Sequence, residues 1–285
     1  MAEAGYGLIG EKLGHSFSPY IHGELGGYDY RLIELERGEL GRFLKRGAFR
    51  GLNVTVPYKK DVIPYCAWLS PEARRIGSVN TIVNDGGLLR GYNTDYFGFV
   101  YMLRKAAIGV KGKKALVLGS GGASLTVQAA LHDLGAKSVT VISRGGEDNY
   151  GNLERHADAR LIVNTTPVGM YPKVEAAPLS LEIFPDCEAV ADIIYNPSRT
   201  KLLLDAEARG IPCANGLPML VAQAKAAAEL FLGRDIPDAR IDEITSIIEK
   251  RTKNIILIGM PGCGKTTVGK LLARTSAENS QTRMK

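Results

Sequence analysis

The 285-residue sequence lacks several features that would place it in a particular class of protein. It has no apolar run near the roughly 18 residues that a membrane span needs, and no basic stretch followed by an apolar one at its start. Its four cysteines form no CxxC pair and have no histidine at metal-ligand spacing; they are Cys66, Cys187, Cys213 and Cys263. These absences argue against a disulfide framework and a zinc site, and they predict a cytoplasmic protein.

The sequence also lacks blocks of like charge and internal repeats. The formal net charge is +6 at pH 7, yet Lys and Arg are interleaved with Asp and Glu, so no basic arm indicates nucleic acid binding. A mild basic excess suits an anionic substrate or a phosphorylated cofactor. Low-complexity sequence is confined to the final TSAENSQTRMK. We therefore expect a globular protein that acts on a small molecule, without nucleic acid or membrane partners, and the oligomeric state stays open.

Short apolar runs alternate with helix-like stretches along the chain. The runs typical of buried strands are YGLIG, YRLIEL, LNVTV, SVNTIV, ALVLG, SVTVIS, RLIVNTT and AVADIIY. The helix-like stretches are Glu39 to Lys45, Tyr96 to Ala107, Ser124 to Leu134 and Leu217 to Leu232. The alternation predicts an α/β fold with parallel sheets covered on both faces. Because a domain averages roughly 150 residues, the length predicts two domains.

A glycine-rich turn follows the strand Ala115 to Leu118 and leads into a helix. It reads Gly119-Ser120-Gly121-Gly122-Ala123, and such a turn aims backbone N–H groups and the positive end of a helix at a pyrophosphate. Ser124 stands where a third glycine is usual, so an ordinary turn before a helix is the alternative. The context of strand, turn and helix favours a dinucleotide site.

The next strand ends at Ser143-Arg144, where NAD-binding folds often place an acidic residue against the ribose 2′-hydroxyl. A basic residue there favours NADP, because arginine forms charge-assisted hydrogen bonds to a 2′-phosphate. The alternative is a solvated arginine in a surface loop.

Polar residues occur at specific places in the amino-terminal part. Ser16 and Ser18 fall on alternate positions of an expected short extended turn, where both hydroxyls could face one carboxylate. Lys59 follows an apolar strand, and Asn80 and Asp95 stand at strand ends or turns. Ligands bind beyond the carboxyl ends of parallel strands, so these residues could converge. Taken singly, each has a structural alternative: turn residues, a solvated lysine, or a helix cap at Asp95.

Eight segments in order along the chain resemble the shikimate dehydrogenase family. They run from the start to about Lys250 and are GHSFSP, GLNVTVPYK, SVNT, GYNTD, GSGGAS, NTTPVGM, IIYNPSRT and GLPMLVAQA. The resemblance implies an α/β substrate domain (residues 1–100 and 217–250), a Rossmann-like NADP-binding domain (residues 101–216) and a cleft between them. It implies NADP-dependent interconversion of 3-dehydroshikimate and shikimate in aromatic amino acid biosynthesis. The alternatives are a broader quinate/shikimate dehydrogenase and a non-catalytic dinucleotide-binding regulator on the same fold.

The resemblance also implies roles for individual residues. Lys59 and Asp95 would act at the reacting carbon. The substrate would be bound by Ser16 and Ser18 at its carboxylate, by Thr55, Asn80 and Gln223 at its ring hydroxyls, and by Tyr195 at the cleft. The cofactor-binding positions would be Gly119, Ser120, Gly121, Gly122, Ala123, Ser143, Arg144, Asn164, Thr165, Thr166, Pro167, Met170 and Gly216. No metal is expected, because the cofactor supplies the hydride.

The sequence departs from the family pattern around the cofactor. The family usually has Ala at position 120, where this chain has Ser. It also has an Asn-Arg-Thr clamp where this chain has Ser143-Arg144-Gly145, followed by Glu147 and Asp148. These acids would repel a 2′-phosphate if they pointed at it.

The expected chemistry follows from the residue types. Reduction of a ketone by hydride leaves negative charge on oxygen, and a positioned cation that can give up a proton stabilises that charge and neutralises it. Lys59 fits this role, and Asp95 would orient its ammonium group. His15 and His22 lie near the serine motif, where we expect structural rather than catalytic roles.

A second motif begins after Lys250. The segment Asn254 to Ile258 reads as an apolar strand, and the next eight residues fit the phosphate loop GxxxxGK[ST] before a helical VGKLLART. This part resembles the opening of shikimate kinase, so residues 251–285 are predicted to be a truncated kinase-like stub. A kinase domain needs a sheet, a Mg²⁺-holding acid and a lid within about 100 residues or more, so phosphotransfer is not expected. A disordered tail or a docked helix is the alternative. The candidate phosphate-loop residues are Gly259, Gly264, Lys265 and Thr266.

Overall fold

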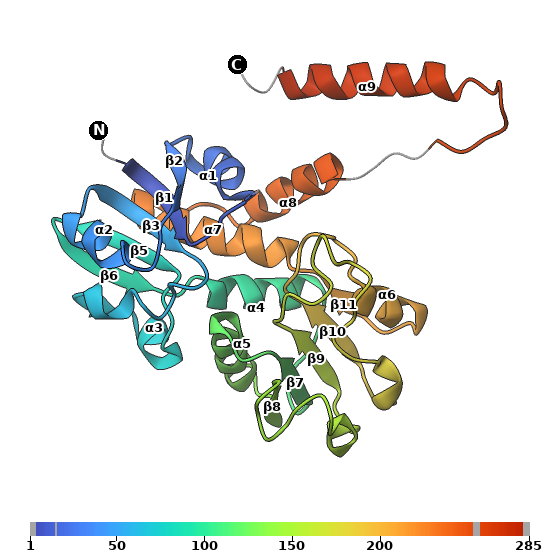
Figure 1. Cartoon of the computed structure of the whole chain (residues 1–285), viewed down its shortest axis with the longest axis horizontal. Coiled ribbons are helices and arrows are strands. Elements are labelled where there is room, and N and C mark those ends of the chain that lie inside the picture. Colours follow the sequence, from blue (N-terminus) through green and yellow to red (C-terminus); the bar gives the residue numbers. More distant parts are fainter. Residues whose placement is uncertain (1–3, 15, 253–256, 282–285) are drawn as a thin grey trace. The chain divides into compact units, whose positions relative to one another are not determined.

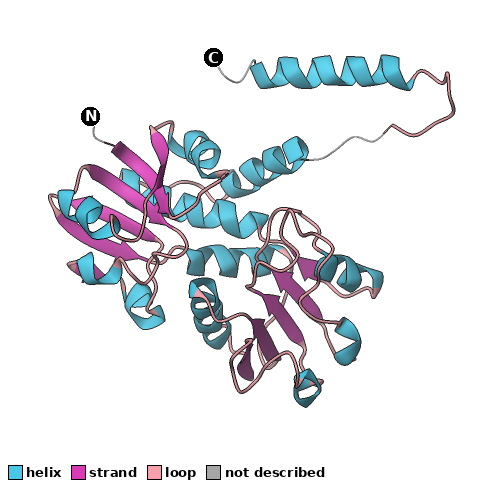
Figure 2. Cartoon of the chain, in the orientation of Figure 1, coloured by secondary structure: helices cyan, strands magenta, loops and turns pink. Residues whose placement is uncertain are grey.

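A computed structural model describes residues 4–14, 16–252 and 257–281 of the chain. Its contacts divide the chain into two compact units, residues 1–245 and residues 246–285. The first unit contains two β-sheets with helices packed on them, which confirms the predicted α/β class (Figure 2). None of the helices formed by the described residues is long and apolar enough to cross a membrane.

The first sheet has six strands in the order β2-β1-β3-β5-β6-β4. Its first three members in sequence are parallel, but β5 pairs antiparallel with both β3 and β6. The prediction of a parallel sheet is therefore wrong for this half of the fold. For β5 and β6 the reason is local, because Gly86 and Gly87 both take a positive φ, and this two-residue turn reverses the chain between the two strands without a crossover helix. The strands are β1 Ala4–Gly10, β2 Tyr30–Glu34, β3 Phe49–Val54, β4 Trp68–Leu69, β5 Thr81–Asp85 and β6 Leu88–Tyr92.

Three short helices accompany this sheet: α1 Ser18–Gly26, α2 Leu40–Arg46 and α3 Pro71–Ile76. The core beneath α2 joins strand residues Ile9, Leu52 and Ile82 to Leu44 of the helix, and all four are at most 2% exposed. Burial of these aliphatic side chains fixes the ends of the strands from which the polar residues project.

The second sheet is wholly parallel, in the order β11-β10-β9-β7-β8, as predicted for a Rossmann-like half. The four residues from Ala115 to Leu118 are fully buried, because helices cover both faces of a parallel sheet. Its elements are β7 Lys114–Leu118, α5 Gly122–Asp133, β8 Ser138–Ile142, β9 Leu161–Asn164, β10 Ala189–Asp192, α6 Lys201–Ala208 and β11 Cys213–Ala214, with 3₁₀ turns at Leu153–His156 and Leu181–Ile183. A further 3₁₀ turn, Ile63–Tyr65, lies between β3 and β4 of the first sheet.

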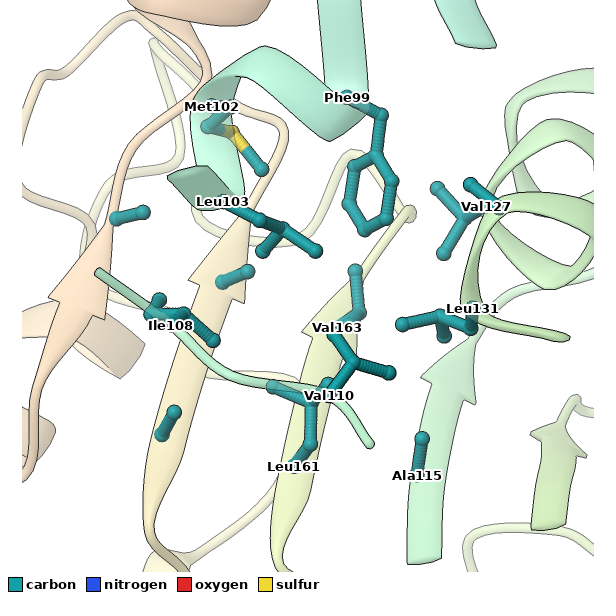
Figure 3. Close-up of a cluster of buried hydrophobic side chains, with 14 of the residues drawn as sticks. Phe99, Met102, Leu103, Ile108, Val110, Ala115, Val127, Leu131, Leu161 and Val163 are labelled. Atoms are coloured by element: carbon teal, nitrogen blue, oxygen red, sulfur yellow. The ribbon is translucent and has the colours of Figure 1, made fainter. Parts of the chain in front are cut away.

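Helix α4 (Asp95–Lys105) packs over the second sheet. Its residues Phe99 and Leu103 pack with Val127 and Leu131 of α5 and with Val163 of β9 (Figure 3). Because this core is closely packed, it holds the helix, and with it Asp95 at the helix start, at a fixed position relative to β7 and α5.

Helix α7 (Leu217–Leu232) has the bounds predicted from the sequence, and it runs beside α4 (Figure 1). The two backbones approach closely at Gly98, where an added Cβ would lie 2.6 Å from the carbonyl oxygen of Met219. This close approach brings Gln223 of α7 to the residues at the start of α4.

Helix α8 (Ala239–Thr252) extends across the division between the two units. In the second unit, α9 (Lys265–Gln281) confirms the helix predicted for VGKLLART. The predicted strand is wrong where it can be checked, since Leu257 and Ile258 are in no strand. Its first three residues, 254–256, lie outside the described residues.

Candidate active site

The residues expected at the reacting carbon form an ion pair. The Nζ atom of Lys59 lies 2.6 Å from Oδ2 of Asp95, and the two side chains are 15% and 10% exposed. Lys59 lies in the segment after β3, next to the fully buried Tyr58. The carbonyl oxygen of Lys59 accepts a hydrogen bond from the N–H of Val79 at 2.8 Å. The alternative of a solvated lysine is therefore wrong, because the ammonium group is held by a largely buried carboxylate.

Asp95 is the first residue of α4, where the free N–H groups and the dipole of the helix stabilise a carboxylate. The cap position belongs to Thr94, so the alternative of Asp95 as the cap itself is wrong. The side chain of Asn80 fixes this cap, since its Oδ1 accepts from the Thr94 N–H at 2.7 Å and its Nδ2 donates to the Thr94 hydroxyl at 3.0 Å.

Asn80 belongs to a buried polar network that reaches a residue far away in the sequence. Its Nδ2 donates to Oε1 of Gln223 at 3.4 Å. Behind it, Asn53 donates to the Thr81 hydroxyl at 3.1 Å and accepts from the Tyr30 hydroxyl at 2.7 Å. Asn53 and Thr81 were not among the predicted site residues. The available signal was their polarity inside otherwise apolar strands.

Ser16 and Ser18 lie together at the start of α1. The Ser16 hydroxyl donates to the Ser18 hydroxyl at 3.1 Å and accepts from the Ser18 N–H at 3.2 Å. The predicted extended turn is wrong, because Ser18 begins the helix and Pro19 occupies its first turn, where proline's fixed φ and missing N–H are tolerated. The two hydroxyls thus lie at a helix amino terminus, which favours a carboxylate ligand.

Tyr195 lies beside the serine segment, and Thr55 follows β3. The Tyr195 ring, after β10, lies 6.0 Å between centroids from Phe17, the residue between the two serines, and burial raises the pKa of its hydroxyl. Thr55 directly follows β3, and its N–H donates to the carbonyl oxygen of Ile9 at 2.9 Å. The structure thus forms one group around Ser16 and another around Lys59, and no hydrogen bond among the described residues joins them.

The predicted dinucleotide turn connects β7 and α5. Gly119 has a φ of +101°, and an added Cβ there would lie 2.9 Å from Cγ2 of Thr166, so a side chain is excluded by conformation and by space. After Ser120, Gly121 precedes the helix and Gly122 begins it, followed by Ala123. The backbone N–H groups of this helix start are available to a pyrophosphate.

The start of α5 lies against Lys59. A Cβ added at Gly122 would lie 3.6 Å from Cδ of Lys59. A buried hydrogen bond of 3.2 Å from Asn93 to the Thr126 hydroxyl joins α5 to the loop before α4. The glycine-rich turn and the Lys59–Asp95 ion pair are therefore neighbours.

A second loop beside the turn carries more of the predicted cofactor residues. Asn164 is fully buried, and its Oδ1 accepts from the N–H and the hydroxyl of Thr166 at 3.0 and 2.7 Å. Its Nδ2 donates to the buried carboxylate of Asp192 at 3.1 Å, and Thr165 donates to the carbonyl oxygen of Leu118 at 2.6 Å. The buried Asn164 side chain thus fixes the position of the loop after β9. Further along the same loop, Pro167 leads to Met170, which is 46% exposed.

The loop after β8 carries the predicted 2′-phosphate site. Arg144 is exposed and forms no ion pair or hydrogen bond with any residue that the structure describes. The N–H of Ser143 donates to the backbone carbonyl of Asp148 at 3.2 Å, which closes the loop. Arg144 is therefore available to an anion.

Gly216 caps α7 and contacts the segment that follows β10. A Cβ added to it would lie only 1.9 Å from the carbonyl oxygen of Ile193. Its N–H donates to the carbonyl oxygen of Ile194 at 2.9 Å. The predicted cofactor residue is thus at the contact between α7 and the segment after β10.

The histidine near the serine motif has a structural environment. His22 is fully buried, stacks on Tyr30 with ring centroids 4.0 Å apart, and burial lowers its pKa to about 3. This supports the expected structural role. His15 lies outside the described residues.

In the candidate phosphate loop of the second unit, the lysine side chain binds the backbone of the loop itself. Nζ of Lys265 donates to the carbonyl oxygens of Gly259 and Met260, each at 2.7 Å. Gly264 takes a positive φ before α9, and Thr266 is in its first turn. No β-strand is present in the part of this unit that is described, residues 246–252 and 257–281.

The sequence and the fold are similar to those of known proteins. Residues 8–82 match the model of the shikimate dehydrogenase substrate binding domain. The shikimate dehydrogenase (NADP(+)) of Clostridium beijerinckii is 37% identical over 269 residues, which cover 87% of this chain and 99% of that protein.

Two solved structures resemble the chain closely. One is a chorismate mutase/shikimate 5-dehydrogenase fusion protein from Clostridium acetobutylicum, with 38% identity and a TM-score of 0.82 over 87% of this chain and 98% of that one. The other is shikimate 5-dehydrogenase from Thermus thermophilus in complex with NADP(H) and shikimate, with 36% identity and a TM-score of 0.77 over 85% and 98%. The chain therefore belongs to the shikimate dehydrogenase family.

Proposed function

We propose that this chain is an NADP-dependent shikimate dehydrogenase that interconverts 3-dehydroshikimate and shikimate. The observation that carries the proposal is the Lys59–Asp95 ion pair, at 2.6 Å, beside the start of α5. A non-catalytic regulator would have no need of this pair next to its dinucleotide turn. Initial rates with NADP and NAD, each against shikimate and quinate, test the proposal. Absence of shikimate-dependent NADPH formation would refute it.

The division of labour within the chain is part of the proposal. Residues 1–100 and 217–250 would form the substrate domain, and residues 101–216 the NADP domain. Ser16 and Ser18 would bind the substrate carboxylate, and Thr55, Asn80, Gln223 and Tyr195 would bind the rest of the ring. Support comes from the helix start that carries both serines and from the buried amides of Asn80 and Gln223. The four free cysteines suit a cytoplasmic enzyme.

The residues present fit the cofactor. The Gly119 turn and the N–H groups at the start of α5 would bind the pyrophosphate, and Arg144 would bind the 2′-phosphate. When bound, NADPH supplies the hydride that reduces the ketone carbon.

The proton for the alcohol would come from Lys59. In reduction, the C=O bond becomes a C–O single bond, and the ammonium group of Lys59 gives one proton to the oxygen as negative charge develops on it. In oxidation, neutral Lys59 takes that proton back. Asp95 orients Nζ of Lys59 through a 2.6 Å contact, so the lysine side chain is already ordered before the reaction begins.

Replacement of the two serines is expected to affect binding more than turnover. Ser16→Ala and Ser18→Ala each remove a hydrogen bond to a carboxylate that is charged in the ground state and in the transition state alike. Each should raise the KM for shikimate by about tenfold, since a hydrogen bond to a charged group contributes about 1.5–3 kcal/mol. Steady-state kinetics check this. A loss confined to kcat would contradict the assigned role.

Arg144 is expected to determine the preference for NADP. Arg144→Ala removes a charge-assisted bond to the 2′-phosphate, so kcat/KM for NADP should fall by about tenfold or more while that for NAD stays within about twofold. Arg160→Ala is the control, because it removes an exposed arginine of the same half of the fold whose ion-pair partner is Glu188, at 3.1 Å. Equal use of NAD and NADP by the wild-type enzyme would refute the assignment.

For the second unit we propose a vestigial phosphate loop without phosphotransfer. Deletion of everything after Lys250 should leave kcat and KM of the dehydrogenase unchanged, because no residue of the proposed active site lies beyond Gln223. The full chain should form no shikimate phosphate from ATP. A phosphate loop needs a strand paired within a sheet and an acid for Mg²⁺, and Leu257 and Ile258 are in no strand. ATP-dependent phosphorylation that Lys265→Ala abolishes would contradict this.

A further inference from the structure

The loop between β8 and the following 3₁₀ turn contains a carboxylate that a histidine holds in place. Oδ1 of Asp148 lies 2.7 Å from Nε2 of His156, while the nearest arginine nitrogen, Nη1 of Arg155, is 3.9 Å away. The His156 side chain is 11% exposed and that of Asp148 28% exposed. A buried ring nitrogen facing a carboxylate donates its proton to it, so the direction of the Asp148 side chain is fixed by this bond.

The position of Asp148 explains why this bond matters. Its backbone carbonyl accepts from the N–H of Ser143, which directly precedes Arg144, and an added Cβ at Gly146 would lie 3.1 Å from the same carbonyl oxygen. The chain therefore returns at Asp148 to the base of the Arg144 side chain. NAD-binding folds use an acid in this region to bind the ribose 2′-hydroxyl, and such an acid repels a 2′-phosphate.

The rest of the loop is held independently of His156. Nδ2 of Asn152 donates to the carbonyl oxygen of Glu147 at 2.9 Å, and the N–H of Asn149 donates to Oδ1 of Asn152 at 2.8 Å. Oδ1 of Asn149 in turn accepts from the N–H of Gly151 at 2.9 Å. The His156–Asp148 bond is therefore not needed to close the loop backbone, and its separate effect is on where the carboxylate points.

We propose that His156 is a positioning residue for cofactor choice: by binding the Asp148 carboxylate it keeps that charge away from the 2′-phosphate that Arg144 binds. This inference rests on the proposed NADP preference of Arg144. It also accounts for the presence of an acid four residues after Arg144 in a site that selects NADP. While His156 binds its carboxylate, Asp148 does not affect the choice between NADP and NAD.

The test measures nucleotide binding without the reaction. Isothermal titration calorimetry gives the Kd of adenosine 2′,5′-bisphosphate and of AMP, and their ratio reports recognition of the 2′-phosphate alone. His156→Ala should reduce the preference for the bisphosphate by about tenfold, equivalent to about 1.4 kcal/mol. His156→Gln, whose amide N–H can replace Nε2–H, should retain most of the preference.

The double variants separate the released charge from general damage. His156→Ala with Asp148→Asn should restore the wild-type preference, because the freed side chain no longer carries a charge. His156→Ala with Glu147→Gln should not restore it, although it removes one charge from the same loop, because the exposed Glu147 side chain has no bond to His156. Asp148→Asn alone should keep or raise the preference.

Three results would overturn the proposal. These are an unchanged preference in folded His156→Ala, a loss that Asp148→Asn fails to reverse, or a fall in preference in Asp148→Asn itself. The last of these decides the matter even if His156→Ala does not fold. Failure of the proposed function would be seen in the wild-type protein itself. That protein would then show no preference for the bisphosphate over AMP, or no oxidation of shikimate, before any variant is compared.

Discussion

Lys59→Ala is expected to lower kcat for shikimate oxidation by about 10²- to 10⁴-fold, the range that a positioned acid–base group contributes. The KM should change by less than about threefold, because the ammonium group interacts most strongly with the charge that develops on oxygen during the reaction. Initial rates at saturating shikimate and NADP measure both effects. A variant with near-normal kcat would remove Lys59 from the mechanism.

Three further variants show which property of Lys59 matters. Lys59→Arg keeps the positive charge but cannot give up a proton at neutral pH, so it should recover little turnover. Asp95→Asn keeps Lys59 but loses the carboxylate 2.6 Å from its Nζ, and kcat should fall by about 10- to 100-fold. Lys60→Ala is the matched control, since the neighbouring Lys60 is exposed, and its kinetics should equal those of the wild type.

The fold was predictable where apolar runs are long and continuous. The strands β7, β8, β9 and β10 and helix α7 all follow from such runs. Strand β6 (Leu88–Tyr92) could not be predicted in this way, because it alternates buried and exposed residues and contains Arg90. The antiparallel pairing of β5 with β6 followed from one glycine turn, a signal that the regular alternation of strands and helices concealed.

The site was predictable from the sequence in its residue types but not in its contacts. The resemblance assigned Lys59, Asp95, Asn80 and Gln223, yet the hydrogen bond between Asn80 and Gln223 joins residues 143 positions apart. Packing of α7 against α4 and β5 creates that contact. The bond between Asp148 and His156 was hidden for a similar reason, since nothing in the spacing of an Asp and a His shows that they meet.

Gly216→Ala is expected to be the most destabilising glycine-to-alanine change among the described residues, because its added Cβ would make the shortest contact. Gly216 has a φ of −76° and a ψ of −4°, which alanine adopts without strain, so the whole effect comes from contact. The added Cβ would lie 1.9 Å from the carbonyl oxygen and 2.4 Å from the carbonyl carbon of Ile193. Both atoms belong to the backbone, so no side-chain rotation relieves the clash.

Relief of that clash requires α7 to move away from the segment after β10. This movement would break the hydrogen bond from the Gly216 N–H to Ile194 and shift Gln223 on the same helix. Overpacking against rigid neighbours costs about 1–3 kcal/mol or more, so the melting temperature should fall by about 5–10 °C. The KM values for NADP and shikimate should rise together. Thermal unfolding followed by circular dichroism, with kinetics at 25 °C, measures both.

Gly23→Ala is the matched control, because it adds the same methyl group within helix α1, where an added Cβ meets no atom within 4 Å. Alanine is a better helix former than glycine by about 1 kcal/mol, so this variant should melt at or slightly above the wild-type temperature. If Gly216→Ala had the same melting temperature as Gly23→Ala, α7 would be shown to move freely at its start. Gln223 would then be held by its own hydrogen bonds rather than by the contact between Gly216 and Ile193.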